Sequence, residues 1–141
     1  MNENHVYFIV KKNNSTGIKM TTAVPFKICS MCKTSWDSRE QFLNDATLDL
    51  NGYMADPNIP ENGLFYFTHK RTDCFSTLAI QTSQFLDLHT GKKYDELKYN
   101  TDECQGHCFS KNDLSPCNAN CSCAYIREII QILQAKKDNQ Q

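Results

Sequence analysis

The sequence lacks the motifs that mark the best-defined enzyme classes. It has no G-x-G-x-x-G fingerprint, no glycine-rich phosphate loop with lysine, no G-x-S-x-G elbow and no H-E-x-x-H motif. Its adjacent acidic pairs, such as Asp95-Glu96, lie in a polar segment, where solvated surface is expected rather than a catalytic carboxylate pair. Nothing in the sequence argues for an enzymatic activity, and a role without catalysis is the expectation.

Long apolar runs are also missing. No stretch is long enough to span a bilayer, and the first residues lack the basic and apolar regions of a secretory signal. These absences predict a cytoplasmic protein with no membrane association. In a reducing cytoplasm, closely spaced cysteines remain thiols, which favours metal binding over disulfides.

An excess of charge of one sign is absent as well, because the net charge is −1 and the isoelectric point is about 6.4. Residues 1–34 carry five lysines and one glutamate, whereas residues 35–103 carry twelve acids and six bases. Sequence-independent phosphate binding normally needs a concentrated basic face, so nucleic-acid binding is a minor hypothesis. It would rest on the lysines and aromatic residues of the N-terminal part: Tyr7, Lys11, Lys12, Lys19, Phe26, Lys27 and Lys33.

Local patterns predict several short elements. Residues 5–28 read as a hairpin with its turn at 13–17, and residues 48–54, 63–69 and 77–82 read as further strands. A capping box with Asp37 as N-cap and Glu40 as its partner predicts one short helix, and residues 83–88 predict another. The closing helix has an apolar stripe at i, i+3, i+4 and i+7, before a tail that is expected to fray from Lys136: Ile126, Ile129, Ile130 and Leu133.

These elements predict an α+β fold with a small, mostly antiparallel sheet, short helices and a C-terminal amphipathic helix. The chain of 141 residues is long enough to bury a core without cross-links. We expect residues 1–91 to form an α+β domain and residues 92–103 a polar linker. Residues 104–137 would form a cysteine-rich loop and the last helix, packed on the first part as one domain.

The first group of metal-ligating residues begins with Cys29-x2-Cys32, a spacing that lets a zinc-ribbon-like knuckle place two thiolates on one ion. His69 and Cys74 follow an aromatic strand and would supply the second pair of ligands. Two alternatives remain. The first two cysteines could form a thioredoxin-like redox pair, although the next helix is predicted to begin five residues after Cys32. Cys74 and His69 could instead be ordinary buried side chains.

The second group holds five cysteines within twenty residues, and a tetrahedral zinc site or a cubane iron-sulfur cluster needs four of them. The surrounding residues suit a tightly turned loop, which would be poorly ordered without a ligand. One thiol is spare, and the sequence leaves open whether it is Cys121 or Cys123. Both lie at the start of the last helix, where the helix dipole favours thiolates as ligands or nucleophiles. His107 could replace a cysteine as a ligand. The five are Cys104, Cys108, Cys117, Cys121 and Cys123.

A pattern of cysteines, aromatic residues and glycines extends over residues 29–133: Cys29-x2-Cys32, Trp36, Phe42-Leu43-Asn44-Asp45, Gly52-Tyr53, the run from Gly63 to His69, Cys104-x3-Cys108, Cys121-x-Cys123 and Tyr125-Ile126-Arg127-Glu128. In this pattern the chain resembles small uncharacterised cysteine-rich bacterial proteins. Those proteins have no assigned activity, so the resemblance implies an architecture and not a function: a CxxC…H…C half and a C-terminal cysteine cluster.

The leading prediction is a cytoplasmic zinc-binding protein with two structural sites, acting as an interaction or regulatory module. It would be a monomer or weak dimer with a protein partner. The alternative is a redox-sensing or electron-transfer protein, with an iron-sulfur cluster or a reversible dithiol within Cys104 to Cys123. Colour distinguishes the two, because zinc thiolates are colourless.

Overall fold

The computed structural model describes residues 9–11, 18–20 and 24–139, and for the first two segments only the backbone pairing. Strands β1 (Ile9–Lys11) and β2 (Ile18–Met20) pair antiparallel, with Ile9 opposite Met20. This pairing agrees with the first part of the predicted hairpin, whose turn at 13–17 and first residues from His5 lie outside the described residues. The predicted end of its second strand is wrong, because residues 27–28 pair with residues 35–36 in a separate sheet.

A three-stranded antiparallel sheet is the centre of the fold, in the order β5 (Leu48–Met54), β6 (Leu64–His69) and β7 (Thr77–Gln81). All three strands were predicted within one residue at each end. The buried positions of β6 alternate with less buried ones, as expected when one face of a sheet covers a core. This alternation turns Phe65, Phe67 and His69 to the same buried side.

The segment before the sheet folds into a small hairpin and a helix. Strands β3 (Lys27–Ile28) and β4 (Ser35–Trp36) pair antiparallel, and helix α1 (Arg39–Leu43) follows. The N-cap is Ser38, whose Oγ accepts a hydrogen bond from the Gln41 amide at 3.1 Å, so the predicted cap at Asp37 is wrong by one residue. The Gln41 side chain accepts from the Asp37 amide at 2.7 Å, which completes a capping arrangement shifted by one position.

The chain closes with helix α2 (Ala124–Asp138), which buries Ile126, Ile129, Ile130 and Leu133. The predicted fraying from Lys136 is wrong, because the helix continues to Asp138. Lys137 is 6% exposed and its Nζ donates to the carbonyl oxygens of Leu43 at 3.2 Å and Asp45 at 2.6 Å. A lysine at the end of a periodic pattern is normally solvated, and here two backbone acceptors near the end of α1 order it.

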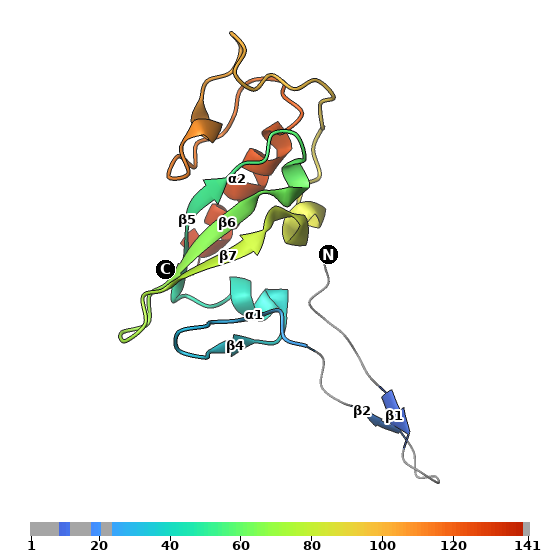
Figure 1. The fold of residues 1–141 in the computed structure, drawn as a ribbon, viewed down its shortest axis with the longest axis vertical. Helices are drawn as coiled ribbons and strands as arrows, with labels where there is room; N and C mark the ends of the chain where they lie inside the picture. The colour runs from blue at the N-terminus through green and yellow to red at the C-terminus, as the bar shows by residue number, and fades with distance from the viewer. Residues whose placement is uncertain (1–8, 12–17, 21–23, 140–141) are drawn as a thin grey trace.

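Three short 3-10 helices complete the described elements: η2 (Pro60–Asn62), η3 (Thr82–Leu88) and η4 (His107–Phe109). Figure 1 shows α2 along one face of the sheet, with β4 and α1 near one end of the molecule and the cysteine-rich loop at the other. Within the described residues, no helix combines the length and the apolar character needed to cross a membrane. The observed architecture is α+β, with small antiparallel sheets and a few helices.

The core consists mainly of aromatic rings between the sheet, α1 and α2. The Phe42 ring lies edge-on to Phe67 at a centroid distance of 4.9 Å and to Trp36 at 5.2 Å. Trp36 also meets the His69 ring at 5.1 Å. The core therefore extends to the end of the sheet at which the first group of predicted ligands lies.

Candidate metal centre

The turn between β3 and β4 holds Cys29 and Cys32 on one side of a tight loop. The Cys29 amide donates to the Thr34 carbonyl at 2.8 Å, and the Lys33 amide donates to the Cys29 carbonyl at 2.8 Å. Lys33 has a φ of +68°, in the left-handed region that costs a residue with a side chain about 1–3 kcal/mol. A strained backbone at this position turns the chain sharply enough to return it to β4.

A second turn, between β6 and β7, holds His69 and Cys74. The His69 amide donates to the Ser76 carbonyl at 2.8 Å, and the Cys74 amide donates to the Arg71 carbonyl at 2.8 Å. Phe75 has a φ of +53°, so each turn has a residue in the left-handed conformation directly after its last cysteine. The two turns therefore share a local design although their sequences differ.

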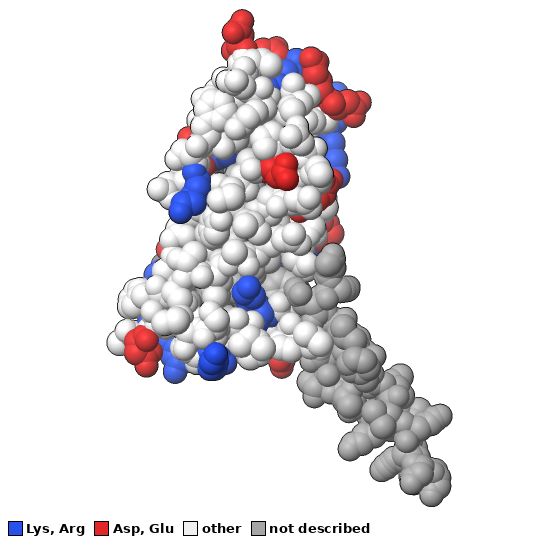
Figure 2. All heavy atoms as spheres, in the orientation of Figure 1, with Lys and Arg blue, Asp and Glu red and all other residues white. Residues whose placement is uncertain are grey.

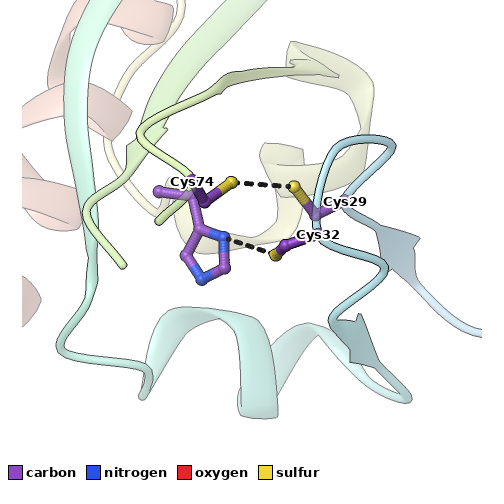
Figure 3. A group of neighbouring side chains, drawn as sticks. Cys29, Cys32 and Cys74 are labelled. Atoms are coloured by element: carbon purple, nitrogen blue, oxygen red, sulfur yellow. Dashed lines mark hydrogen bonds between the residues drawn. The ribbon is translucent and has the colours of Figure 1, made fainter. Parts of the chain in front are cut away.

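The two turns bring four predicted ligands together (Figure 3). The sulfurs of Cys29 and Cys74 are 3.6 Å apart, and the Cys32 sulfur is 3.5 Å from Nδ1 of His69. A tetrahedral zinc ion with Zn–S bonds of about 2.3 Å sets its ligand atoms ~3.6–3.8 Å apart. One ligand atom from each of Cys29, Cys32, His69 and Cys74 lies within 4.8 Å of the others, and we call this group the metal centre.

Hydroxyl groups surround the sulfurs of the metal centre. Ser76 Oγ lies 3.2 Å from the Cys29 sulfur and 3.1 Å from the Cys74 sulfur, and Thr34 Oγ1 lies 3.1 Å from the Cys32 sulfur. Arg71 Nη1 donates to Thr34 Oγ1 at 2.9 Å and so links the two turns. Hydrogen bonds from outer groups orient metal ligands and tune their basicity, and Ser76 and Thr34 are placed for this role.

The electrostatics favour a thiolate at the most buried cysteine. Burial alone would raise the pKa of the Cys29 thiol, but hydrogen bonds from backbone amides, led by Cys32, and from the Ser76 hydroxyl lower it to about 5. The Ser76 hydroxyl would also lower the pKa of Cys74, but burial and the neighbouring sulfurs of Cys29 and Cys32 raise it. Thiolates are the form of cysteine that binds metal ions, so Cys29 is ready for ligation at neutral pH.

The five later cysteines are arranged differently. They line one small cavity with a volume of about 20 Å³, which we call the cysteine cavity: Cys104, Cys108, Cys117, Cys121 and Cys123. The Cys121 and Cys123 sulfurs are 3.4 Å apart, and both residues are buried. Among the described residues, however, the metal centre alone brings three or more such ligand atoms all within 4.8 Å of one another.

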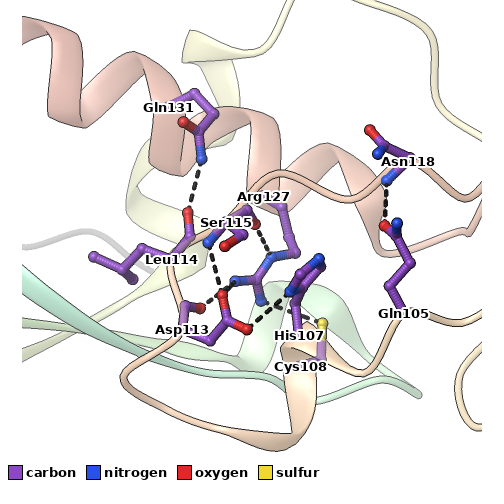
Figure 4. A network of polar contacts seen from close by, with 9 residues as sticks. All are labelled: Gln105, His107, Cys108, Asp113, Leu114, Ser115, Asn118, Arg127 and Gln131. Carbon is purple, nitrogen blue, oxygen red and sulfur yellow. Dashed lines mark hydrogen bonds and ion pairs between the residues drawn. The ribbon is translucent and has the colours of Figure 1, made fainter.

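A buried arginine orders the loop around the cysteine cavity (Figure 4). The side chain of Arg127 is 0% exposed, its Nε donates to the Ser115 carbonyl at 2.6 Å, and its Nη2 donates to the Asp113 carbonyl. Its Nη1 lies 3.4 Å from the Cys108 sulfur. The loop was predicted to be poorly ordered without a ligand, yet these contacts tie it to α2.

The same network sets the charges beside the cysteine cavity. A hydrogen bond from Cys123, opposed by burial and reinforced by Arg127, lowers the pKa of Cys108 to about 6. The bond to Cys108, together with burial, raises the pKa of Cys123. His107 Nδ1 lies 2.8 Å from Asp113 Oδ2, and the bonds from His107 and from Ser115 lower the pKa of Asp113.

Sequence reasoning missed Ser76 and Thr34 in the metal centre and Arg127 beside the cysteine cavity. A serine or threonine two positions after a ligating cysteine gives only a weak signal. Arg127 had a stronger one, because it lies four positions after Cys123 and residues at that spacing share a helix face.

One of the aromatic residues named in the minor hypothesis of nucleic-acid binding is buried in the structure. Phe26 is 4% exposed and packs against Phe42 and Phe85, so its ring is not available to stack on a base. The side chains of Tyr7, Lys11, Lys12 and Lys19 lie outside the described residues. Figure 2 shows acidic and basic side chains scattered over the face in view, with no continuous basic stripe on it.

Comparison of the chain with protein-family models, with curated proteins and with solved structures finds no match.

Proposed function

We propose that this chain is a zinc-binding protein in which the metal centre is a structural site, and that it acts as an interaction or regulatory module. The observation that carries the proposal is the convergence of four ligand atoms, from Cys29, Cys32, His69 and Cys74, within 4.8 Å. These ligands come from two turns that are 37 to 45 positions apart in the sequence.

The donor set favours zinc in a structural role. Three thiolates and one imidazole form a Cys₃His set, which is typical of structural zinc sites. Four protein ligands fill the tetrahedral sphere and leave no position for the water that a catalytic zinc needs. Cys29 is 0% and His69 is 1% exposed, so an ion there would be largely enclosed by protein.

A role in protein interaction is supported by the outer surface of the two turns. Met31, between the first two cysteines, is 68% exposed, and Phe75, directly after Cys74, is 60% exposed. Ile28 beside them is 49% exposed. A metal ion would fix both turns and hold these apolar side chains outward, where a protein partner in the cytoplasm could contact them.

Elemental analysis with an absorption spectrum tests the proposal on the full chain, purified without oxygen or chelator. We expect bound zinc, no visible absorbance, and loss of about one zinc ion per chain in His69→Ala. Retention of all bound zinc in His69→Ala would show that the metal centre is not the site.

The second candidate is redox sensing or electron transfer through an iron-sulfur cluster or a reversible dithiol at the cysteine cavity. It is favoured by the five cysteines that line one cavity. A volume of about 20 Å³ suits a single ion or water molecule better than a multinuclear cluster, which ranks this candidate second. Iron with sulfide and a brown colour in the same measurement would move the proposal to this candidate.

A further inference from the structure

The cysteine cavity lies where three segments meet: the polar stretch at Lys98 and Tyr99, the loop that begins at Cys104, and the N-terminus of α2. Its volume of about 20 Å³ exceeds the minimum needed to hold one water molecule. A cavity of this size lined by five sulfurs has the right chemistry for one thiophilic metal ion.

Four of the five cysteines form a connected group. Cys123 lies at the centre, because its sulfur is 3.4 Å from the Cys121 sulfur and its interaction with Cys108 lowers the pKa of Cys108 and raises its own pKa. Cys117 packs against the buried cluster that contains Cys121 and Cys123. Two sulfurs on one tetrahedral zinc ion are ~3.8 Å apart, so Cys121 and Cys123 already lie near the separation that one ion requires, and the sulfurs of Cys108 and Cys117 would have to close on the same ion.

Nitrogen donors already point at sulfurs in this group. The backbone amide of Lys98 donates to the Cys121 sulfur at 3.2 Å, and Arg127 Nη1 donates to the Cys108 sulfur at 3.4 Å. Zinc bound to four thiolates carries a net charge of about −2, which N–H donors and nearby cations stabilise. Arg127, with its side chain 0% exposed, and the N-terminus of α2 supply positive charge at this position.

Cys104 differs from the other four. It lines the cavity, but among the described residues it belongs to neither packed cluster of buried side chains, whereas Cys108 packs against the main core and Cys117 against the smaller cluster. Cys104 therefore lines the cavity without belonging to the packed group that contains Cys123.

We propose that Cys108, Cys117, Cys121 and Cys123 bind a second zinc ion as four thiolates, with Cys104 outside the ligand set. The expected spare thiol thus moves from the start of α2 to Cys104. This inference goes beyond the proposed function, because it uses none of the ligands of the metal centre. The second ion would fasten the loop to α2 as the first fastens the two turns to the sheet.

Zinc stoichiometry in three variants of the full chain, purified without oxygen, tests the assignment. We expect about two zinc ions in the wild type, about one in Cys117→Ser and about two in Cys104→Ser, which is the matched control. Cys32→Ser, which removes a ligand of the metal centre, should also retain about one. Loss of zinc in Cys104→Ser, or unchanged zinc in Cys117→Ser, would overturn the inference.

The two proposals fail in different variants. If Cys117→Ser keeps all its zinc and Cys32→Ser loses zinc, the metal centre is supported and the second site is refuted. If Cys117→Ser loses zinc and Cys32→Ser keeps all of it, the second site is supported and the metal centre is refuted. If Cys117→Ser does not fold, cobalt titration of the metal-free wild type decides. Two binding phases with different visible spectra, one for three thiolates with an imidazole and one for four thiolates, support the second site, and a single phase overturns it.

Discussion

His69 shows how one residue can be placed by two kinds of packing. Its position in β6 turns it to the same side as Phe65 and Phe67, and its ring meets Trp36 edge-on at 5.1 Å. Trp36 is itself held by a hydrogen bond from its Nε1 to Asp45 Oδ2 at 2.8 Å. The imidazole is therefore fixed by hydrophobic contacts while Nδ1 faces the Cys32 sulfur at 3.5 Å.

Substitution of a ligand in the first turn tests the metal centre at the residue scale. We expect Cys32→Ser to lose about one zinc ion per chain and to make residues 24–47 sensitive to protease, because an uncharged hydroxyl binds zinc far more weakly than a thiolate. Metal analysis and limited proteolysis measure both effects. Ser30→Ala in the same exposed turn is the control, and equal loss in both variants would point to general damage to the turn.

Asp45 gives a pH dependence with a defined sign. Burial alone would raise its pKa, but hydrogen bonds from Thr47 and from Trp36 lower it below the ordinary 3.8. Its contribution to stability is therefore present above about pH 4 and is lost as the pH falls through the lowered value. We expect Asp45→Asn to cost about 1 kcal/mol at pH 7, with the difference from wild type shrinking below about pH 4 in urea titrations. A difference that stays constant down to pH 2 would contradict this assignment.

At the scale of elements, α2 runs from the cysteine cavity to the region of α1. Its first turn adjoins Cys123 and Arg127 at the cysteine cavity, and Lys137 near its other end donates to carbonyls of Leu43 and Asp45 close to α1. Fifteen residues of helix span about 22 Å. The helix therefore extends between the cysteine-rich loop and the part of the molecule that contains α1 (Figure 1).

Removal of the buried Arg127 guanidinium should loosen the contact between the loop and α2. Arg127→Met leaves two carbonyl oxygens without their donor, and we expect a loss of about 3 kcal/mol in the free energy of unfolding. Proteolysis should increase within residues 104–115. Lys136→Met removes an exposed cation from the same helix and should change stability by less than about 0.5 kcal/mol. Equal effects of the two substitutions would mean that the charge, and not the buried contacts, is what matters.

At the scale of the whole molecule, metal removal should lower stability throughout. The turns of the metal centre meet the core at Trp36 and Phe42. Loosening of the turns should therefore weaken the packing of the sheet and α1. With free zinc at about a thousand times its dissociation constant, binding contributes about 4 kcal/mol, so chelation should lower the melting temperature by on the order of 10 °C. Thermal unfolding before and after chelation, with zinc added back, measures this. An unchanged melting temperature in protein shown to be metal-free would contradict a structural role.

The local elements could be predicted from short stretches of the sequence. The three strands of the sheet were predicted from β-prone and aromatic runs bounded by turn residues, and the last helix from the 3.6-residue repeat of its apolar side chains. The Cys29-x2-Cys32 pair was also readable, since a close spacing brings two sulfurs to one turn whatever the rest of the chain does.

The contacts between residues far apart in the sequence depend on how the elements pack together. The closure of His69 and Cys74 onto the first turn depends on strand register and on aromatic packing around Trp36 and Phe42, which no short segment encodes. The burial of Arg127 and of Lys137 was equally hidden, because their acceptors are carbonyl groups supplied by other segments. Long-range contacts determine whether such charged side chains are buried, and the spacing of residues along the sequence does not predict these contacts.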